Sequence, residues 1–220
     1  AYFSGNPFIN DLGISLSDLK WGASCDYEWT ANEHISDVVD VWKHGWDEDL
    51  GTVPPESLGA SYRKHSDLVA DADRTVLHYM QPHAPYLSRG KGQKLKQIQN
   101  GIRRQGEGDD GGALSAVTDR VRPKVESFLD DSKFAQKVGL WLELDPIELV
   151  RNGTREAAME LYEENLRIAM ESVAELVTEL DGDVVVTADH GEAFGEQGVW
   201  EHHVETHIDP LMQVPWLEVR

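Results

Sequence analysis

Cysteine is almost absent from this chain, where Cys25 is the only one among 220 residues. A single cysteine cannot form an internal disulfide, which excludes a disulfide-stapled fold and favours a reducing compartment such as the cytoplasm. Long apolar runs are absent as well. None approaches the roughly 18 residues that a membrane-spanning helix needs, and no signal-peptide pattern opens the chain. We therefore expect a cytoplasmic protein without a membrane span.

Positive charge is scarce, since Lys and Arg number 20 against 40 Asp and Glu, for a formal net charge of −20. Such a field repels nucleic acid and anionic membranes, so we expect no nucleic-acid partner. Disorder is not indicated, because 40% of the residues are hydrophobic and seven are Trp. The acidic residues are instead typical of a folded protein whose surface stays hydrated in concentrated salt, as in a salt-accumulating microbe.

Strand-like and helix-like segments alternate along the chain. The hydrophobic pattern predicts strands at residues 2–4, 37–42, 75–80, 184–187 and 214–220, and helices near residues 54–68, 115–128, 146–151 and 154–180. This order predicts an α/β fold with a mostly parallel sheet and helices on both faces. We expect one domain over residues 1–220, with a polar insertion near residues 88–112. Both ends of the chain look cut, so we expect a fragment that is incomplete at its N-terminus.

The helix at residues 154–180 has the clearest pattern. Thr154 is suited to its N-cap, and Asp181-Gly182 to its exit. Its apolar residues recur at helical spacing: Ala158, Leu161, Leu166, Ala169, Val173, Leu176, Val177 and Leu180.

The most informative segment is the strand at residues 184–187 followed by Asp189-His190-Gly191-Glu192. The strand delivers an acid and an imidazole to the point where it ends, and Gly191 permits a sharp change of backbone direction. Asp and neutral His are a common oxygen–nitrogen pair for a divalent metal ion. The alternative is a turn or helix cap in which Asp189 accepts backbone N–H bonds and His190 is merely exposed.

Polar side chains also follow other predicted strands. Asn6 follows the first strand and His83 the third, as Asp189 and His190 follow the fourth. In open parallel sheets, ligands collect beyond the carboxyl ends of the strands. We therefore expect these metal-capable or anion-binding groups to meet at one edge of the sheet.

Several motifs together resemble a known family. They are Asp189-His190-Gly191-Glu192, the later Leu211-x-x-Val214-Pro215, His78-x-x-x-Pro82-His83-x-Pro85-Tyr86, and Tyr162-x-x-Asn165-Leu166 on the long helix. In this order they resemble the sulfatase-like branch of the alkaline phosphatase superfamily, and most closely sulfatase-like proteins of salt-loving archaea. The match covers most of the chain outside residues 88–146. It implies a metal-dependent hydrolase of sulfate esters.

The resemblance implies roles for particular residues. Asp189 and His190 would bind a divalent metal ion (Ca²⁺, Mg²⁺ or Mn²⁺) beside a covalent nucleophile. His83 would bind the sulfuryl or phosphoryl oxygens or protonate the leaving oxygen, and His202 would contact the same anion. A solvated surface histidine is the alternative for His202. With Asn6 as a further substrate-binding residue, the expected substrate is a small anionic ester, of which a sulfated or phosphorylated glycan is one candidate.

The chain also departs from the family pattern. That family takes its nucleophile and two further acidic ligands from a segment near its N-terminus, with Cys or Ser in a Cys/Ser-x-Pro-x-Arg motif, or Thr in the phosphotransferases. Cys25 does not stand in that motif, and no other Cys, Ser or Thr does. We therefore expect half a metal site, no nucleophile, and no activity of this chain alone.

Other readings remain open. Many arylsulfatases have Asn after the ligand Asp, whereas His190 is the form found in phosphonate hydrolases and phosphotransferases, so a phosphoester or phosphonate hydrolase or a phosphotransferase is the alternative. A non-catalytic binding relative is another.

Glu192 and Glu196 are candidates to hold His190 in one tautomer. Three tryptophans belong either to a glycan-binding cleft or to the core: Trp42, Trp46 and Trp141. A basic cluster is either an anion-recruiting patch or a solvated loop: Arg89, Lys91, Lys94, Lys96, Arg103 and Arg104.

Overall fold

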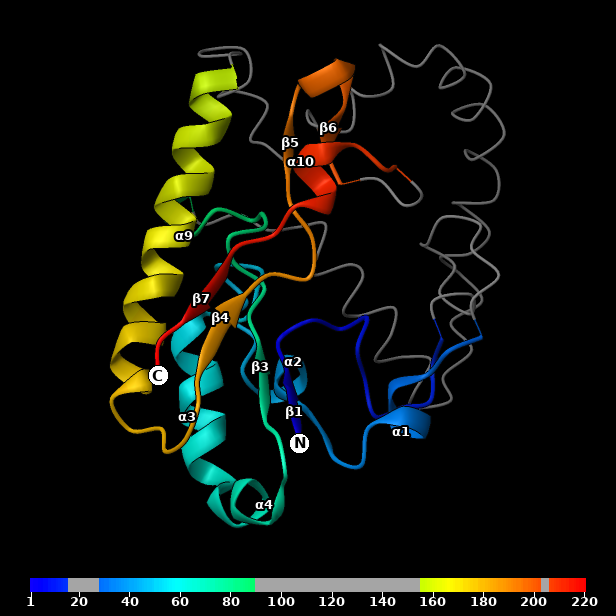
Figure 1. Cartoon of the computed structure of the whole chain (residues 1–220), viewed down its shortest axis with the longest axis vertical. Coiled ribbons are helices and arrows are strands. Elements are labelled where there is room, and N and C mark those ends of the chain that lie inside the picture. Colours follow the sequence, from blue (N-terminus) through cyan, green and yellow to red (C-terminus); the bar gives the residue numbers. More distant parts are fainter. Residues whose placement is uncertain (16–27, 90–154, 203–205) are drawn as a thin grey trace. The chain divides into compact units, whose positions relative to one another are not determined.

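A computed structural model describes residues 1–15, 28–89, 155–202 and 206–220 of the chain (Figure 1). It divides into two compact units. Unit 1 consists of Ala1–Asp110 and Leu161–Val173, and unit 2 of Gly111–Glu160 and Ala174–Arg220. Each unit is described by itself, so one domain over the whole chain stays a prediction.

Unit 1 contains a three-stranded parallel sheet. Its strands are β1 (Tyr2–Ser4), β2 (Val38–Asp40) and β3 (Val76–His78), in the order β2-β1-β3. Figure 1 labels β1 and β3. Tyr2 pairs with Val38 on one side and Val76 on the other, so the three strands end level with one another. Residues that follow β1 and β3 therefore leave the sheet at the same edge, as predicted for Asn6 and His83.

Short helices complete this part of unit 1: α1 (Ala31–His34), α2 (Val41–His44), α3 (Pro55–Lys64), α4 (Ser66–Asp71) and the 3-10 turn η1 (Leu87–Arg89). Pro55 opens α3, as the sequence predicts, because its fixed φ suits the first helical position. The predicted strand at 37–42 ends early, at Asp40. Val41 and Trp42 are fully buried and belong to the helix α2 instead, which begins directly after the strand.

The core of unit 1 is a cluster of fully buried side chains: Phe3, Val41, Trp42, Val53 and Leu58. Trp46 is partly buried against this cluster. Trp42 and Trp46 are thus core residues of unit 1, and the glycan-cleft alternative is wrong for Trp42, which exposes none of its surface.

The long helix α9 (Arg155–Val177) confirms the strongest helix prediction. Its buried positions recur at helical spacing, but one of them is polar: Asn165 is 1% exposed, whereas the neighbouring Leu166 is 40% exposed. The helix ends at Val177, short of the predicted Leu180, and Gly182 follows with a φ of 89°. Residues 161–173 of α9 belong to unit 1 and the rest to unit 2.

Unit 2 contains two antiparallel strand pairs. β4 (Val185–Thr187) pairs with β7 (Trp216–Glu218), and β5 (Ala193–Phe194) pairs with β6 (Trp200–Glu201). The described part of this unit also contains the 3-10 turn η2 (Glu196–Gly198) and α10 (Asp209–Met212). The chain is therefore a mixed α/β protein. The prediction that the strand at 184–187 belongs to the parallel sheet is wrong over the described residues, because β4 pairs with β7 in an antiparallel sheet of its own. Asp189 and His190 therefore do not follow a strand of the sheet that carries Asn6 and His83.

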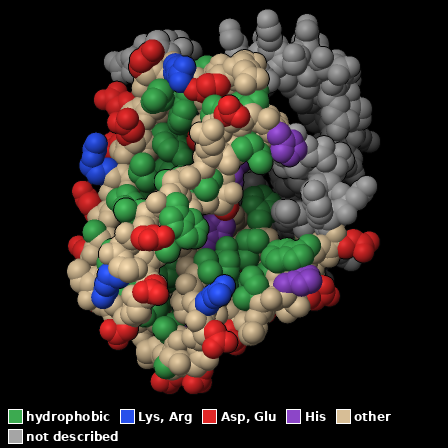
Figure 2. All heavy atoms as spheres, in the orientation of Figure 1, with side chains coloured by type: hydrophobic (Ala, Val, Ile, Leu, Met, Phe, Trp, Pro, Cys, Tyr) green, Lys and Arg blue, Asp and Glu red, His purple; other side chains and the backbone are tan. Residues whose placement is uncertain are grey.

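Other predictions lie on residues that the structure does not describe. They concern Cys25, Trp141, the N-cap at Thr154, the polar insertion beyond residue 89 with most of the basic cluster, and the helices at 115–128 and 146–151. Within the described ranges, no helix is both long and apolar enough to cross a membrane. Acidic side chains are spread over the face shown in Figure 2, with fewer Lys and Arg among them.

Candidate functional site

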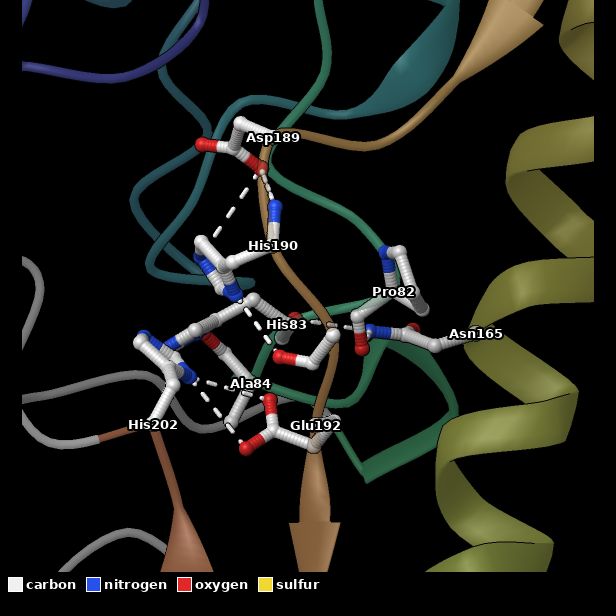
Figure 3. Close-up of polar contacts among 9 residues, drawn as sticks. Pro82, His83, Ala84, Asn165, Asp189, His190, Glu192 and His202 are labelled. Carbon is white, nitrogen blue, oxygen red and sulfur yellow. Dashed lines mark hydrogen bonds and ion pairs between the residues drawn. The ribbon is translucent and has the colours of Figure 1, made fainter. Parts of the chain in front are cut away.

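Asp189 and His190 follow the end of β4 in unit 2, and the Asp189 carboxylate lies close to both the backbone and the ring of His190. The backbone N–H of His190 donates to Asp189 Oδ1 (3.1 Å), and His190 Nε2 lies 3.8 Å from the same oxygen (Figure 3). His190 Nδ1 is 2.8 Å from the carbonyl oxygen of Gly191. A carbonyl only accepts, so Nδ1 carries the proton and, in the neutral ring, Nε2 keeps its lone pair.

His202 joins this pair through a ring stack. The imidazoles of His190 and His202 have centroids 4.1 Å apart and planes inclined by 29°. His202 Nδ1 faces both carboxylate oxygens of Glu192, at 3.2 and 3.1 Å (Figure 3). Each ring therefore turns Nδ1 toward an oxygen of the protein, which fixes its orientation. The side chain of Glu192 is only 11% exposed, so this contact is sheltered from water.

Gly191 has a role that differs from the predicted one. It is not among the described glycines with positive φ. A Cβ atom there would instead lie 1.9 Å from the backbone oxygen of Pro210, and the Gly191 N–H donates to Leu211 O (2.9 Å). Thr187 Oγ1 donates to Pro215 O (2.7 Å). The Asp-His-Gly-Glu segment and the residue 211–215 motif thus lie against each other in unit 2.

Glu192 and Glu196 do not hold His190, because the structure gives both carboxylates other partners. Glu192 faces His202, while Glu196 pairs with Arg155 and accepts from the N–H of Phe194 (2.6 Å). Burial raises the pKa of the Glu196 carboxyl, but backbone N–H groups and the charge of Arg155 outweigh it, so that the pKa lies below its ordinary value. The tautomer of His190 is set by the carbonyl of Gly191 instead.

Asn6 and His83 follow β1 and β3 in unit 1. The side-chain oxygen of Asn6 accepts from the N–H of Phe8 (3.0 Å), which closes a turn just beyond the strand. The backbone N–H of His83 donates to the backbone oxygen of Met80 (3.1 Å), and the ring Nδ1 of His83 contacts the carbonyl oxygen of Ala84. Both residues lie beyond the ends of neighbouring parallel strands, and Asn6 stabilises the turn that Gly5-Asn6-Pro7 predicts.

Asn165 is a residue whose role the sequence analysis missed. Its amide donates to the carbonyls of Pro82 (3.2 Å), His83 (3.0 Å) and Pro85 (3.3 Å), and its oxygen accepts from the N–H of Leu87 (2.9 Å) (Figure 3). The signal was present in the sequence, because an amide occupies a position of the helix that the apolar spacing assigns to the core.

Asp40 at the end of β2 was also missed. Asp40 is 8% exposed. Its carboxylate accepts from the backbone N–H of Asp11 (3.0 Å) and pairs with Lys43 Nζ (2.8 Å). The carboxylate therefore ties the loop that carries Asn6 to β2. A charged residue at the end of an apolar strand was the available signal.

The pair of Asp189 and His190 suits a divalent metal ion. Asp189 and His190 would hold the ion through Oδ1 and Nε2, which lie 3.8 Å apart. The side chain of Asp189 is 61% exposed and can approach further by rotation. Over the described parts of the chain, no group of three or more His, Cys, Asp or Glu side chains is arranged to hold a metal. Two ligands are fewer than such a group needs, so a metal site at Asp189 and His190 stays a prediction.

The chain matches no protein-family model, no curated protein and no solved structure. The functional argument therefore depends on the chemistry of these residues.

Proposed function

We propose that the protein is a metal-dependent hydrolase of sulfate esters, with the site of Asp189, His190 and His202 at its centre. The observation that supports it best is the stack of two imidazoles, 4.1 Å apart, whose Nδ1 atoms are both turned toward protein oxygens. Metal-binding histidines are commonly oriented in this way by a second hydrogen bond. The His190 side chain is 40% exposed, so the orientation of the ring, and not its burial, supports the proposal.

Asp189 and His190 would hold the metal ion, which when bound supplies positive charge for the ester oxygens and the nucleophile. His202 would contact the ester anion through its Nε2 edge, because Glu192 occupies the other edge. The carboxylate of Glu192 also stabilises positive charge on this ring when it carries a second proton. His83 and Asn6, which follow strands of the parallel sheet in unit 1, stay candidates for contacts to an ester anion.

Hydrolysis of a phosphate or phosphonate ester, or phosphotransfer, is the second candidate. The presence of His190 in place of Asn favours it, because the Asp-His form occurs in those relatives. A binding protein without catalysis is the third outcome of the test. Both alternatives use the same residues of this chain.

The test measures turnover of p-nitrophenyl sulfate and p-nitrophenyl phosphate by the full-length protein in high salt, with Mn²⁺, Mg²⁺ or Ca²⁺ and with chelator. We expect metal-dependent turnover, faster on the sulfate ester, and at least a 100-fold loss in Asp189→Asn and His190→Ala. Asp183→Asn removes an exposed carboxylate just before β4 and should retain activity. Faster turnover of the phosphate ester would select the second candidate. No turnover of either ester with any metal would overturn both enzymatic proposals.

A further inference from the structure

One buried amide in unit 1 is not explained by packing. Asn165 is 1% exposed on α9, between the buried apolar residues Leu161 and Ala169. Burying an amide without hydrogen bonds is unfavourable, so an apolar residue would serve better at this position if only packing mattered. The partners of the amide must therefore account for its presence.

Those partners all lie in the loop at residues 82–87, which follows β3 and carries His83. The amide nitrogen is within 3.0–3.3 Å of three carbonyl oxygens, those of Pro82, His83 and Pro85. The amide oxygen accepts from the N–H of Leu87 at 2.9 Å. One side chain thus contacts the backbone on both sides of His83 and at His83 itself.

The loop needs such a donor because it has few backbone N–H groups of its own. Pro82 and Pro85 have no backbone N–H, so two of its residues can accept hydrogen bonds but cannot donate them. Buried carbonyl oxygens without donors destabilise a fold. Asn165 is one of the few side chains that can donate to carbonyls and accept from an N–H at the same time.

We propose that Asn165 is a positioning residue that fixes the place of His83 beyond the carboxyl end of β3. The catalytic consequence rests on the proposed function, in which His83 contacts the ester anion. Asn165 acts only through His83, since it holds the backbone from which the imidazole projects. Displacement of such a group by about 1 Å lowers turnover by about 100-fold.

Two variants remove the contacts in different ways. Asn165→Leu keeps the approximate size and removes all four hydrogen bonds. Asn165→Asp keeps an acceptor for the N–H of Leu87 but sets carboxylate oxygens against three carbonyl oxygens. Asn10→Leu is the matched control, because Asn10 is also 1% exposed and makes four hydrogen bonds to the backbone of another loop of unit 1.

The first measurement is the ring ¹H–¹⁵N spectrum of His83 in the full-length protein. We expect shifted or multiple His83 signals in both Asn165 variants and a wild-type signal in Asn10→Leu. The wild-type protein offers a measurement that needs no variant: the side-chain amide of Asn165 should exchange with solvent at least 10-fold more slowly than that of the exposed Asn32. Equal exchange rates, or an unchanged His83 spectrum in folded Asn165 variants, would overturn the proposal.

The second measurement is turnover of p-nitrophenyl sulfate. We expect kcat/KM to fall by about 10- to 100-fold in the Asn165 variants, while binding of Mn²⁺ by calorimetry stays at the wild-type level. A wild-type kcat/KM in the variants refutes the positioning of a catalytic group. Absence of turnover in the wild-type protein refutes the proposed function instead, and the His83 spectrum still decides the structural role.

Discussion

Replacing Gly191 by alanine tests whether the residues after β4 are held by close packing in unit 2. A Cβ atom at Gly191 would lie 1.9 Å from the backbone O of Pro210, 2.9 Å from its carbonyl C, and 3.1 Å from the backbone O of Gln213. Ordinary van der Waals contact begins at 3.4 Å, so the two backbone segments would have to separate by about 1.5 Å. All three obstructing atoms belong to backbone, which cannot rotate aside as a side chain can.

The cost follows from the contacts that this separation breaks. The hydrogen bond from Gly191 N–H to Leu211 O, now 2.9 Å long, would be lost, at about 0.5–1.5 kcal/mol. Overpacking adds about 1–3 kcal/mol. We therefore expect Gly191→Ala to lower the free energy of unfolding by about 2–4 kcal/mol, measured by urea titration with circular dichroism.

The control is the same substitution at Gly59, inside α3. There the nearest atom to a new Cβ is Arg63 Nη1 at 3.4 Å, the far end of a flexible side chain. Because alanine is favoured over glycine in a helix, Gly59→Ala should raise the free energy of unfolding by about 0.5–1 kcal/mol. If Gly191→Ala unfolds at the same urea concentration as the wild type, the close approach of the two segments is refuted.

Two further predictions concern the carboxylates of unit 2. Glu192→Gln keeps an oxygen that can accept from His202 Nδ1, so the ¹⁵N spectrum of the ring should keep one tautomer, whereas Glu192→Ala should give a mixture and about a 10-fold lower kcat/KM. Glu196 has a folded-state pKa below its ordinary value of 4.5. The unfolded state therefore binds more protons in that range, and the stability that Glu196 provides at neutral pH is lost as the pH falls through the folded-state pKa. We expect Glu196→Gln to be less stable than the wild type at pH 7, with the difference shrinking in acid, and a constant difference would refute the linkage.

The elements that the sequence predicts best are those with a local pattern. The helix α9 and the strands β1, β3 and β4 are each specified by the spacing of their own apolar residues, and the structure confirms them. The predicted end of the strand at 37–42 was wrong, because Val41 and Trp42 also suit a strand. Only their joint burial against Phe3 and Leu58 favours a helix. The pairing of β4 with β7 could not be predicted, because strand order depends on contacts between distant segments.

Some features of the site could likewise be predicted from a local pattern, and others could not. Asp189 and His190 could be recognised from their place after an apolar strand, although Val185 of that strand is 40% exposed, and their side chains lie 3.8 Å apart. The pairing of Glu192 with His202 and the contacts of Asn165 could not be read from spacing, because they join residues on different elements. For Asn165 the clue was an amide at an apolar position of the helix, but its partners become visible only in the folded chain.

The net charge bears on the choice between sulfate and phosphate esters. A sulfate monoester carries one negative charge at neutral pH, whereas a phosphate monoester carries nearly two, since its second pKa is about 6. Repulsion by a chain of formal charge −20 therefore disfavours the phosphate ester about twice as strongly. Salt removes this difference, because the Debye length falls to about 3 Å at 1 M. We expect the KM for p-nitrophenyl phosphate to fall more steeply with salt than the KM for p-nitrophenyl sulfate. A ratio of the two KM values that is independent of salt would show that long-range charge plays no part in substrate choice.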